Sequence, residues 1–378
     1  MSRMSNSLFT VAISLLAAAT APVSAQSRIF KKTVKGTPVL MSINVISFGP
    51  NGLLLIGDGR GSQIVAIATG DTKAQKFSVK KIEAIVSVLA GKIGTTSDGI
   101  EILDMAVNPA SKKVYFAIRK QDTKKHLILT VDGSGKVSEF QLDKVKHASL
   151  FLPKGEKAPV NRITDVAWAG DRVIASARAN EEFASKVFVV PAPLSHEAKA
   201  NIYSAETYHI SHRRWETKAP MSVIIPFDEG GEKYVIGAFS CTPVVKYPIS
   251  KLQPGAKVKG ISVIELGSGN RPLDMLSYEK GGKSYVLANT YRFHHKKRPF
   301  GPSPYWTVRF ERDLLGENSK INEKALRRLG SKGPSTDRIT MVEAYHGVTQ
   351  MDKLDSERAI ILRASDAKKV DLEVIGLP

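Results

Sequence analysis

The stretch RPLDMLSYEKGGKSYVLANTYRF, residues 271–293, contains two apolar runs on either side of a Gly-Gly pair. The first run carries one acid, Asp274, and the second ends in polar residues. Short runs rich in Val, Leu and aromatic residues around a glycine pair are typical of two antiparallel strands joined by a tight turn. The stretch therefore predicts a β-hairpin with an acidic residue in its first strand.

The same layout recurs along the chain: an apolar run with a central polar residue, a turn with Gly, Asn or Asp, and a second apolar run. Five further copies span residues 42–59, 101–120, 162–179, 220–240 and 347–365. Third and fourth apolar runs follow several copies, for example at residues 126–132 and 137–143. Four short antiparallel strands repeated about six times predict an all-β fold, the β-propeller.

The copies are spaced by about 50–75 residues, more than the roughly 40–45 residues typical of compact blades. We predict six blades of four strands with long connections, and the spacing also leaves room for a seventh blade. The last copy is followed by one further apolar run, and the strand-like residues 26–36 have no hairpin partner of their own. We therefore expect the N-terminus of the mature chain to complete the last blade, which removes two sheet edges.

Two segments interrupt the four-strand pattern. Residues 80–99 have the composition of an extra strand or of a short helix. Residues 312–337 are rich in helix-forming residues, centred on residues 322–326. We predict that residues 312–337 form a partly helical insertion on the rim of the propeller.

The first 25 residues have the layout of a secretory signal peptide. Arg3 precedes about fourteen mostly apolar residues, and residues 23–25 supply the small side chains that a signal peptidase recognises. The apolar segment is shorter than the roughly 20 residues that a membrane span requires. We expect cleavage after Ala25, no membrane span in the mature chain, and one propeller domain over residues 26–378 that is periplasmic or secreted.

Composition excludes several kinds of site. Cys241 is the only cysteine, which rules out an intramolecular disulfide, a paired-cysteine haem attachment, a cysteine zinc site and an iron–sulfur cluster. The formal net charge is +19 at pH 7, and such a charge attracts acidic partners. An acidic protein or an anionic polymer fits an exported protein better than nucleic acid does; the alternative is that the charge only keeps the protein soluble.

The central polar residues of the six copies are predicted to converge, because the innermost strand of each propeller blade lines a central channel. These residues are Asn44, Asp104, Asp165, Ser222, Asp274 and Gln350. In one interpretation each accepts backbone N–H groups and holds its blade in place. In another, the carboxylates bind a Ca²⁺ ion or serve as acid and base.

The second apolar runs are predicted to end at one rim of that channel. The terminal residues are Asp58, Arg119, Arg178, Arg292 and Arg363, with Cys241 in the remaining copy. The planar fork of an Arg side chain suits a carboxylate, a sulfate or a phosphate. We predict an anion-binding mouth here, and the alternative is that these arginines form ion pairs between blades.

Two loops combine histidines with basic residues. They contain His209, His212, Arg213 and Arg214 in the first, and His294, His295, Lys296, Lys297 and Arg298 in the second. Because adjacent cations repel a metal ion, we predict contact with an acidic partner, or simply solvated loops.

The hairpin layout resembles the propeller superfamily of secreted bacterial proteins, which includes YVTN-type repeat proteins and the cofactor-free propeller subunits beside haem or quinone enzymes. Residues 284–292, SYVLANTYR, are a loose match to the strand after which YVTN repeats are named. The resemblance carries over no catalytic residues. We predict a non-enzymatic binding or scaffold protein for an acidic partner or anionic ligand, without a cofactor. The alternative is a propeller hydrolase, lactonase or lyase that uses the channel acids and a bound Ca²⁺ ion.

Overall fold

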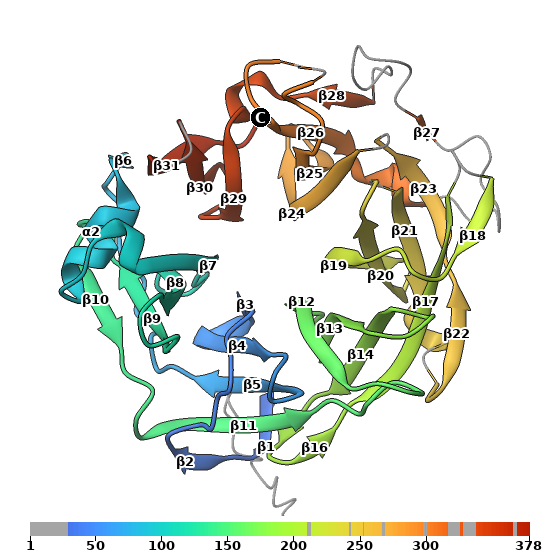
Figure 1. The fold of residues 1–378 in the computed structure, drawn as a ribbon, viewed down its shortest axis with the longest axis horizontal. Helices are drawn as coiled ribbons and strands as arrows, with labels where there is room; N and C mark the ends of the chain where they lie inside the picture. Colours follow the sequence, from blue (N-terminus) through green and yellow to red (C-terminus); the bar gives the residue numbers. More distant parts are fainter. Residues whose placement is uncertain are drawn as a thin grey trace, which may run out of the picture.

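The computed structural model describes residues 29–378, apart from residues 210–212, 242, 252, 267–268, 298, 300, 317–325, 328–337 and 366–368. Six antiparallel sheets stand as blades around a central channel (Figure 1), which confirms the predicted β-propeller with six blades. The predicted signal peptide lies outside the described residues. Within the described part of the chain, no helix is long and apolar enough to cross a membrane.

The blades are numbered here in chain order, with the innermost strand of each given first. Blade 1 consists of β3 (Val45–Phe48), β4 (Leu53–Asp58), β5 (Gln63–Ala68) and β11 (Val145–Phe151). Blade 2 consists of β7 (Ile100–Val107), β8 (Val114–Lys120), β9 (His126–Val131) and β10 (Val137–Phe140). Blade 3 consists of β12 (Val160–Trp168), β13 (Arg172–Ala179), β14 (Ser185–Pro191) and β17 (Asn201–His209).

The other three blades follow the same plan. Blade 4 consists of β19 (Met221–Glu229), β20 (Glu232–Phe239), β21 (Pro243–Pro248) and β23 (Ile261–Glu265). Blade 5 consists of β24 (Asn270–Lys280), β25 (Lys283–Arg292), β26 (Tyr305–Glu311) and β28 (Ile339–Met341). Blade 6 consists of β29 (Val348–Lys353), β30 (Arg358–Ala364), β31 (Val370–Gly376) and β6 (Lys81–Ile82). Short strands outside this plan are β1 (Phe30–Lys32), β2 (Val34–Gly36), β15 (Leu194–Ser195), β16 (Ala198–Lys199), β18 (Arg214–Glu216), β22 (Ala256–Lys259) and β27 (Leu326–Arg327).

The hairpin predicted at residues 271–293 is β24–β25 of blade 5. Its strands pair from Asn270 with Arg292 to Lys280 with Lys283. The turn between them is made by Gly281 and Gly282, at φ +57° and +74°. Both angles lie in the left-handed region that glycine adopts without steric cost, which is why a glycine pair marks this turn in the sequence.

The order of the blades around the ring differs from their order in the chain. Blade 1 lies between blades 2 and 3, since β3 contacts both β7 and β12, and blade 2 closes the ring against blade 6 (Figure 1). The chain leaves β5, adds β6 to the outer edge of blade 6, forms helix α2 (Ile85–Lys92) and builds blade 2. It then returns to blade 1, where β11 supplies the outermost of the four strands.

The prediction that residues 26–36 complete the last blade is wrong. The outer strand of blade 6 is β6, which pairs Ile82 with Leu372 and Lys81 with Glu373. Instead, β1 pairs with β15, and β2 pairs with β11 on the outside of blade 1. The physical reason is reach: the short link from Gly36 to β3 keeps this segment on blade 1, and blade 2 separates blade 1 from blade 6.

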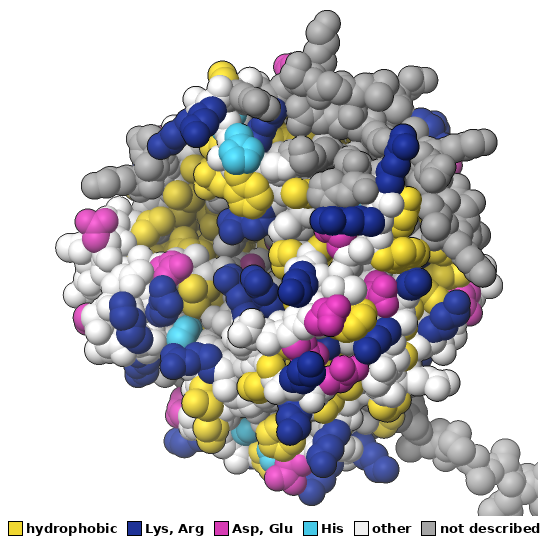
Figure 2. Space-filling model, turned by 45° about the vertical axis from the view of Figure 1, so that its right-hand side comes forward, with side chains coloured by type: hydrophobic (Ala, Val, Ile, Leu, Met, Phe, Trp, Pro, Cys, Tyr) yellow, Lys and Arg dark blue, Asp and Glu magenta, His cyan; other side chains and the backbone are white. Residues whose placement is uncertain are grey.

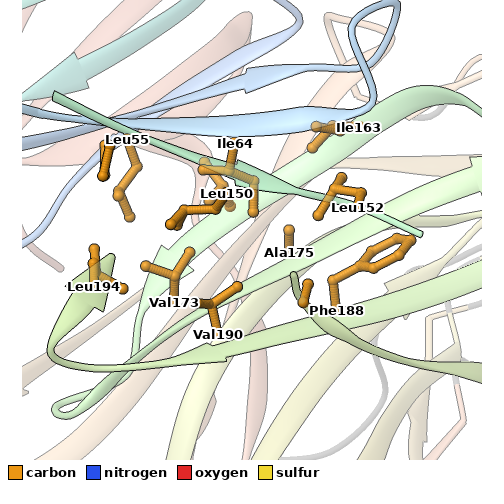
Figure 3. Packing of buried hydrophobic residues seen from close by; sticks show 14 of the residues in the cluster. Leu55, Ile64, Leu150, Leu152, Ile163, Val173, Ala175, Phe188, Val190 and Leu194 are labelled. Atoms are coloured by element: carbon orange, nitrogen blue, oxygen red, sulfur yellow. The ribbon is translucent and has the colours of Figure 1, made fainter. Parts of the chain in front are cut away.

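The core lies between neighbouring blades, because each sheet is apolar on both faces. One cluster joins blade 1 to blade 3: Leu55, Ile64 and Leu150 face Val173, Phe188 and Val190 across the gap between the sheets (Figure 3). A second cluster joins blade 2 to blade 6 and to helix α2. Both clusters support the unusual order of the blades, since burial of apolar area is the main driving force for packing sheets together.

The two segments outside the four-strand pattern are partly described. Residues 80–99 contain both of the predicted elements, strand β6 and helix α2. After β26, residues Arg312–Gly316 form a 3₁₀ helix. Leu326, expected in a helix, lies in β27, which pairs with β23. The remainder of the insertion, including residues 322–325, lies outside the described residues.

Candidate functional site

The six innermost strands enclose a channel of about 1120 Å³. The six residues predicted to form a polar ring all line it: Asn44, Asp104, Asp165, Ser222, Asp274 and Gln350. A further acid that the sequence analysis missed, Asp352, lines the same channel. Asp352 lies two residues after Gln350 in β29, so the alternation of side chains along a strand places both on one face.

The channel acids bind the backbone of the neighbouring blade. One carboxylate oxygen of Asp104 accepts the backbone N–H of Ile46 in blade 1, at 2.7 Å. Asp165 accepts the N–H of Ile224 in blade 4, also at 2.7 Å. In each case the other oxygen accepts the N–H of the following residue, at 2.9 Å for Asp104 and 2.7 Å for Asp165.

Asp274, Asp352 and Asn44 continue the pattern around the ring, whereas the side-chain amide of Gln350 donates to the carbonyl of Leu103 in blade 2. Asp274 of blade 5 accepts the N–H of Met351 in blade 6, at 2.9 Å, and Asp352 of blade 6 accepts the N–H of Val107 in blade 2, at 2.7 Å. Asn44 of blade 1 accepts the N–H of Ile163 in blade 3, at 3.2 Å. All five bonds accepted by the Asp and Asn side chains run in the same direction around the ring, and they join neighbouring blades at five of the six junctions, all except that between blades 4 and 5.

Burial in the channel raises the pKa of every one of these carboxyl groups. The pKa of Asp104 is raised to about 8, that of Asp165 to about 7 and that of Asp352 to about 6, with desolvation as the main cause in each. The pKa of Asp274 is raised well above its ordinary value by burial and by the charge of Asp104. Bonds from backbone N–H groups oppose these effects, because they favour the ionised form.

Metal binding by the ring requires several ligands within reach of one ion. Among the described residues, no group of three or more His, Cys, Asp and Glu side chains is close enough to hold a metal ion. The ring acids stand on separate blades and direct oxygens to neighbouring backbones. Their geometry therefore favours the structural interpretation over a Ca²⁺ site.

The residues predicted at the mouth have different environments. Arg119 forms an ion pair with Glu101, and Arg178 lines the channel. Arg363 is engaged within blade 6, where its Nε donates to Glu373 at 2.9 Å and its guanidinium also donates to backbone carbonyls. Arg292 ends β25 in blade 5. Of these described arginines, Arg178 lines the channel itself, whereas Arg119 lines a separate recess beside it.

Asp58 has a structural role at the rim. Its side chain is fully buried, and it accepts the backbone N–H groups of Met41 and Ser42 at 2.9 and 2.8 Å. It also accepts the hydroxyl of Ser42, the N–H of Gly61 and the side-chain amide of Gln63. Five donors converge on this one carboxylate, which fixes the segment that leads into β3.

A recess of about 470 Å³ opens beside the channel where blades 1, 2 and 3 meet. Four basic side chains line it: Arg60, Arg119, Lys124 and Arg162. They come from the β4–β5 turn, the end of β8, the β8–β9 turn and the start of β12. Glu101 is the one acidic residue among those described around the recess. These residues meet only because blade 1 lies between blades 2 and 3.

Two further groups define the chemistry of the recess. His126 lines its wall, and burial together with the charge of Arg119 lowers the pKa of this imidazole. The Nε atom of Arg119 is buried and has no hydrogen-bond acceptor among the described residues. A buried donor without an acceptor is costly, and an anion in the recess would supply one.

Arg119 was predicted from the sequence as a site residue, whereas Arg60, Lys124 and Arg162 were not. A usable signal was present: Arg60 and Lys124 occupy turns that follow the second strand of their blades, at the same rim as Arg119. Figure 2 shows dark blue Lys and Arg side chains spread over one face of the molecule, several of them near its centre.

The described residues of the two histidine-containing segments differ in burial. His209 is buried in blade 3 with its Nδ1 3.6 Å from Glu265, whereas Arg213 and Arg214 are exposed. His294, Lys296 and Lys297 are exposed on the β25–β26 connection, where His295 is half-buried. His212 and Arg298 lie outside the described residues. Contact of these loops with an acidic partner stays a prediction.

No protein-family model matches the chain, and no curated protein matches it. Among solved structures, it is similar to the PQQ-bound aldose sugar dehydrogenase of Streptomyces coelicolor, with 11% identity and a TM-score of 0.33 over 91% of this chain and 97% of that one. It is also similar to an endo-arabinase of Bacteroides thetaiotaomicron, with 9% identity and a TM-score of 0.36 over 70% of this chain and 89% of that one. Likenesses of this size say nothing about what this chain binds or catalyses.

Proposed function

We propose that this protein binds an anionic ligand in the recess between blades 1, 2 and 3. The observation that supports it is the convergence of Arg60, Arg119, Lys124 and Arg162 on one cavity with Glu101 as the facing acid. Like charges held together repel one another, and a bound anion offsets that repulsion. Arg side chains bind carboxylates, sulfates and phosphates through two parallel N–H donors, which suits a multivalent anion.

The remaining properties of the chain agree with this role. Its formal net charge of +19 raises the local concentration of anions around the recess and speeds their association. The first 25 residues have the layout of a signal peptide, so we place this binding in the periplasm or outside the cell. The resemblance to secreted bacterial repeat propellers is consistent with a binding or scaffold role.

The enzymatic alternative depends on the channel acids. A carboxyl group with a pKa of about 8, as in Asp104, is protonated at neutral pH and has the property of a general acid. Both of its oxygens, however, already lie at hydrogen-bond distance from backbone N–H groups. We therefore give the recess precedence over the acids as the functional site.

The proposal is tested by removing two recess charges together. We expect Arg60→Gln combined with Arg162→Gln to weaken the binding of citrate and of inorganic phosphate by about tenfold or more, since hydrogen bonds to charged groups contribute roughly 1.5–3 kcal/mol each. Both side chains are exposed, so the variant should melt like the wild type. Isothermal titration calorimetry at low salt measures the affinities.

The matched control removes two charges elsewhere. Lys73→Gln with Lys76→Gln changes two exposed lysines on the β5–β6 connection and lowers the net charge by the same amount. We expect this control to retain wild-type affinity. Equal weakening by both variants would mean that only the overall charge of the protein attracts anions, and the recess would then be rejected as a site.

A further inference from the structure

Three exposed apolar residues, Val39, Met41 and Phe151, are linked through Gln63 and Asp58 at the end of blade 1. Val39 and Met41 are the most exposed large hydrophobic residues in the described part of the chain, at 79% and 58%, and Phe151 is 40% exposed. Phe151 pairs with Gln63 at the end of β11, and the side chain of Gln63 donates to the carbonyl of Val39 at 2.7 Å. We call Val39, Met41 and Phe151 the apolar rim.

The apolar rim is held in a fixed position. The backbone N–H of Met41 donates to the buried carboxylate of Asp58, and Gln63 anchors Val39. The main chain of this segment is therefore tied down on both sides of residue 40 while its apolar side chains face solvent. Apolar groups presented on a rigid backbone lose little entropy when a partner covers them, as is typical of binding surfaces.

The apolar rim is continuous with the cationic recess. Ser42 and Ile43, the residues directly after Met41, line the recess. The hydroxyl of Ser42 accepts the backbone N–H of Arg60 at 3.1 Å, which ties the apolar segment to a basic residue of the recess. A single partner is therefore able to contact apolar and cationic groups at the same time.

We propose that the apolar rim and the recess form one docking surface for a protein partner, whose acidic segment enters the recess while its large apolar side chains cover the rim. This inference rests on the proposed function, because it takes the recess to be an anion site and names the class of its ligand. Charge complementarity favours an acidic partner. A concave recess of about 470 Å³ suits an inserted acidic side chain better than the flat surface of a lipid bilayer.

The test uses two fluorescent peptides with equal charge: Glu-Glu-Glu-Glu, and Glu-Glu-Leu-Phe-Glu-Glu, measured by anisotropy. We expect the wild type to bind the peptide with Leu and Phe about tenfold more tightly, because burying large apolar side chains adds to the same electrostatic attraction. Val39→Ser with Met41→Ser should abolish that preference and leave the affinity for tetraglutamate unchanged. Both side chains are exposed, so folding should be unaffected.

The matched control is Val88→Ser. Val88 is also an exposed large hydrophobic residue, at 38%, but it lies on helix α2, which contacts strands of blades 2 and 6. This control should keep the full preference for the peptide with Leu and Phe.

Each other outcome overturns a specific claim. If the wild type binds both peptides equally, or if the Val39 and Met41 variant keeps the preference, the docking surface is rejected while the anion site stands. Tighter, Met41-dependent binding to phosphatidylglycerol vesicles than to either peptide would assign the rim to a membrane instead and reject the protein partner. If neither tetraglutamate nor citrate binds the wild type, the proposed function fails, and this inference fails with it.

Discussion

Replacing Asp58 by alanine should lower the free energy of unfolding by about 3–5 kcal/mol, an effect typical of removing one partner from a buried charged network. The carboxylate is fully buried and accepts five hydrogen bonds, three of them from backbone N–H groups. Alanine leaves these donors without their acceptor, and each buried unsatisfied donor costs about 1–3 kcal/mol. Urea unfolding at pH 7, followed by tryptophan fluorescence, measures the loss.

Two further variants make this prediction specific. Asp58→Asn keeps the shape and one acceptor oxygen, so its loss should be smaller than that of Asp58→Ala. Asp122→Ala removes an exposed carboxylate that bonds only to a neighbouring Thr and a Lys in the described structure, and should cost less than about 0.5 kcal/mol. A loss below about 1 kcal/mol for Asp58→Ala would contradict the view that this acid holds the rim of blade 1.

Asp58 also shows that a sequence repeat predicts where a residue lies along its strand but not the surroundings of its side chain. The repeat correctly places Asp58, Arg119 and Arg178 at the same end of their strands, because paired strands of similar length end at the same level. It does not reveal which way a terminal side chain turns. Asp58 is buried because residues 41–42 and 61–63, before and after its own strand, direct donors toward it, and no periodic pattern encodes that arrangement.

The channel lining could be predicted for a simple reason. Side chains alternate along a strand, so equivalent positions of six equivalent strands face the same channel. The same rule would have added Asp352, which shares a face with Gln350. Asp352 was not predicted because only one position in each blade was compared, and in β29 that position is Gln350.

The order of the blades around the ring could not be predicted from the sequence pattern. Covalent order determines which strands form a hairpin, because short turns leave no other choice, but it does not determine which completed sheets pack side by side. A clue existed in the strand-like residues 145–151, which form a fifth run after the four strands of blade 2 and become the outer strand of blade 1. The recess depends on this exchange, since its basic residues come from blades 2, 1 and 3.

We compare the free energy of unfolding of Asp104→Asn with that of the wild type at two pH values. The difference should favour the variant more at pH 8 than at pH 5. The pKa of Asp104 is raised to about 8 in the folded protein, so the folded state holds a proton that the unfolded chain releases near pH 4. The stability due to this proton is fully present below about pH 4 and is lost as the pH rises toward 8. Because the channel admits water, we expect a relative change on the order of 2 kcal/mol between pH 5 and pH 8.

The substitution should also affect a neighbour. The charge of Asp104 is the second cause of the raised pKa of Asp274, after burial, so removing it should lower the pKa of Asp274 toward its ordinary range. An NMR titration that follows the side-chain carboxyl carbons of the Asp residues measures this change directly. An unchanged titration of Asp274 would show that the two acids do not interact across the channel.

Asp132→Asn provides the matched control for this pH dependence. Asp132 also accepts backbone N–H groups, from Ser134 and Lys136. Burial is the largest single influence on its pKa and raises it, but the hydrogen bonds from Ser134 and Lys136 together outweigh burial and lower the pKa. Its proton is released below pH 4 in both states, so this variant should show no relative change between pH 5 and pH 8.

Asn44 indicates that an amide is tolerated in the ring, because its side-chain oxygen accepts N–H groups from Gly59 and Ile163. If Asp104→Asn changes stability equally at both pH values, Asp104 is ionised at both, and a charged rather than a protonated carboxyl group makes its bond to blade 1.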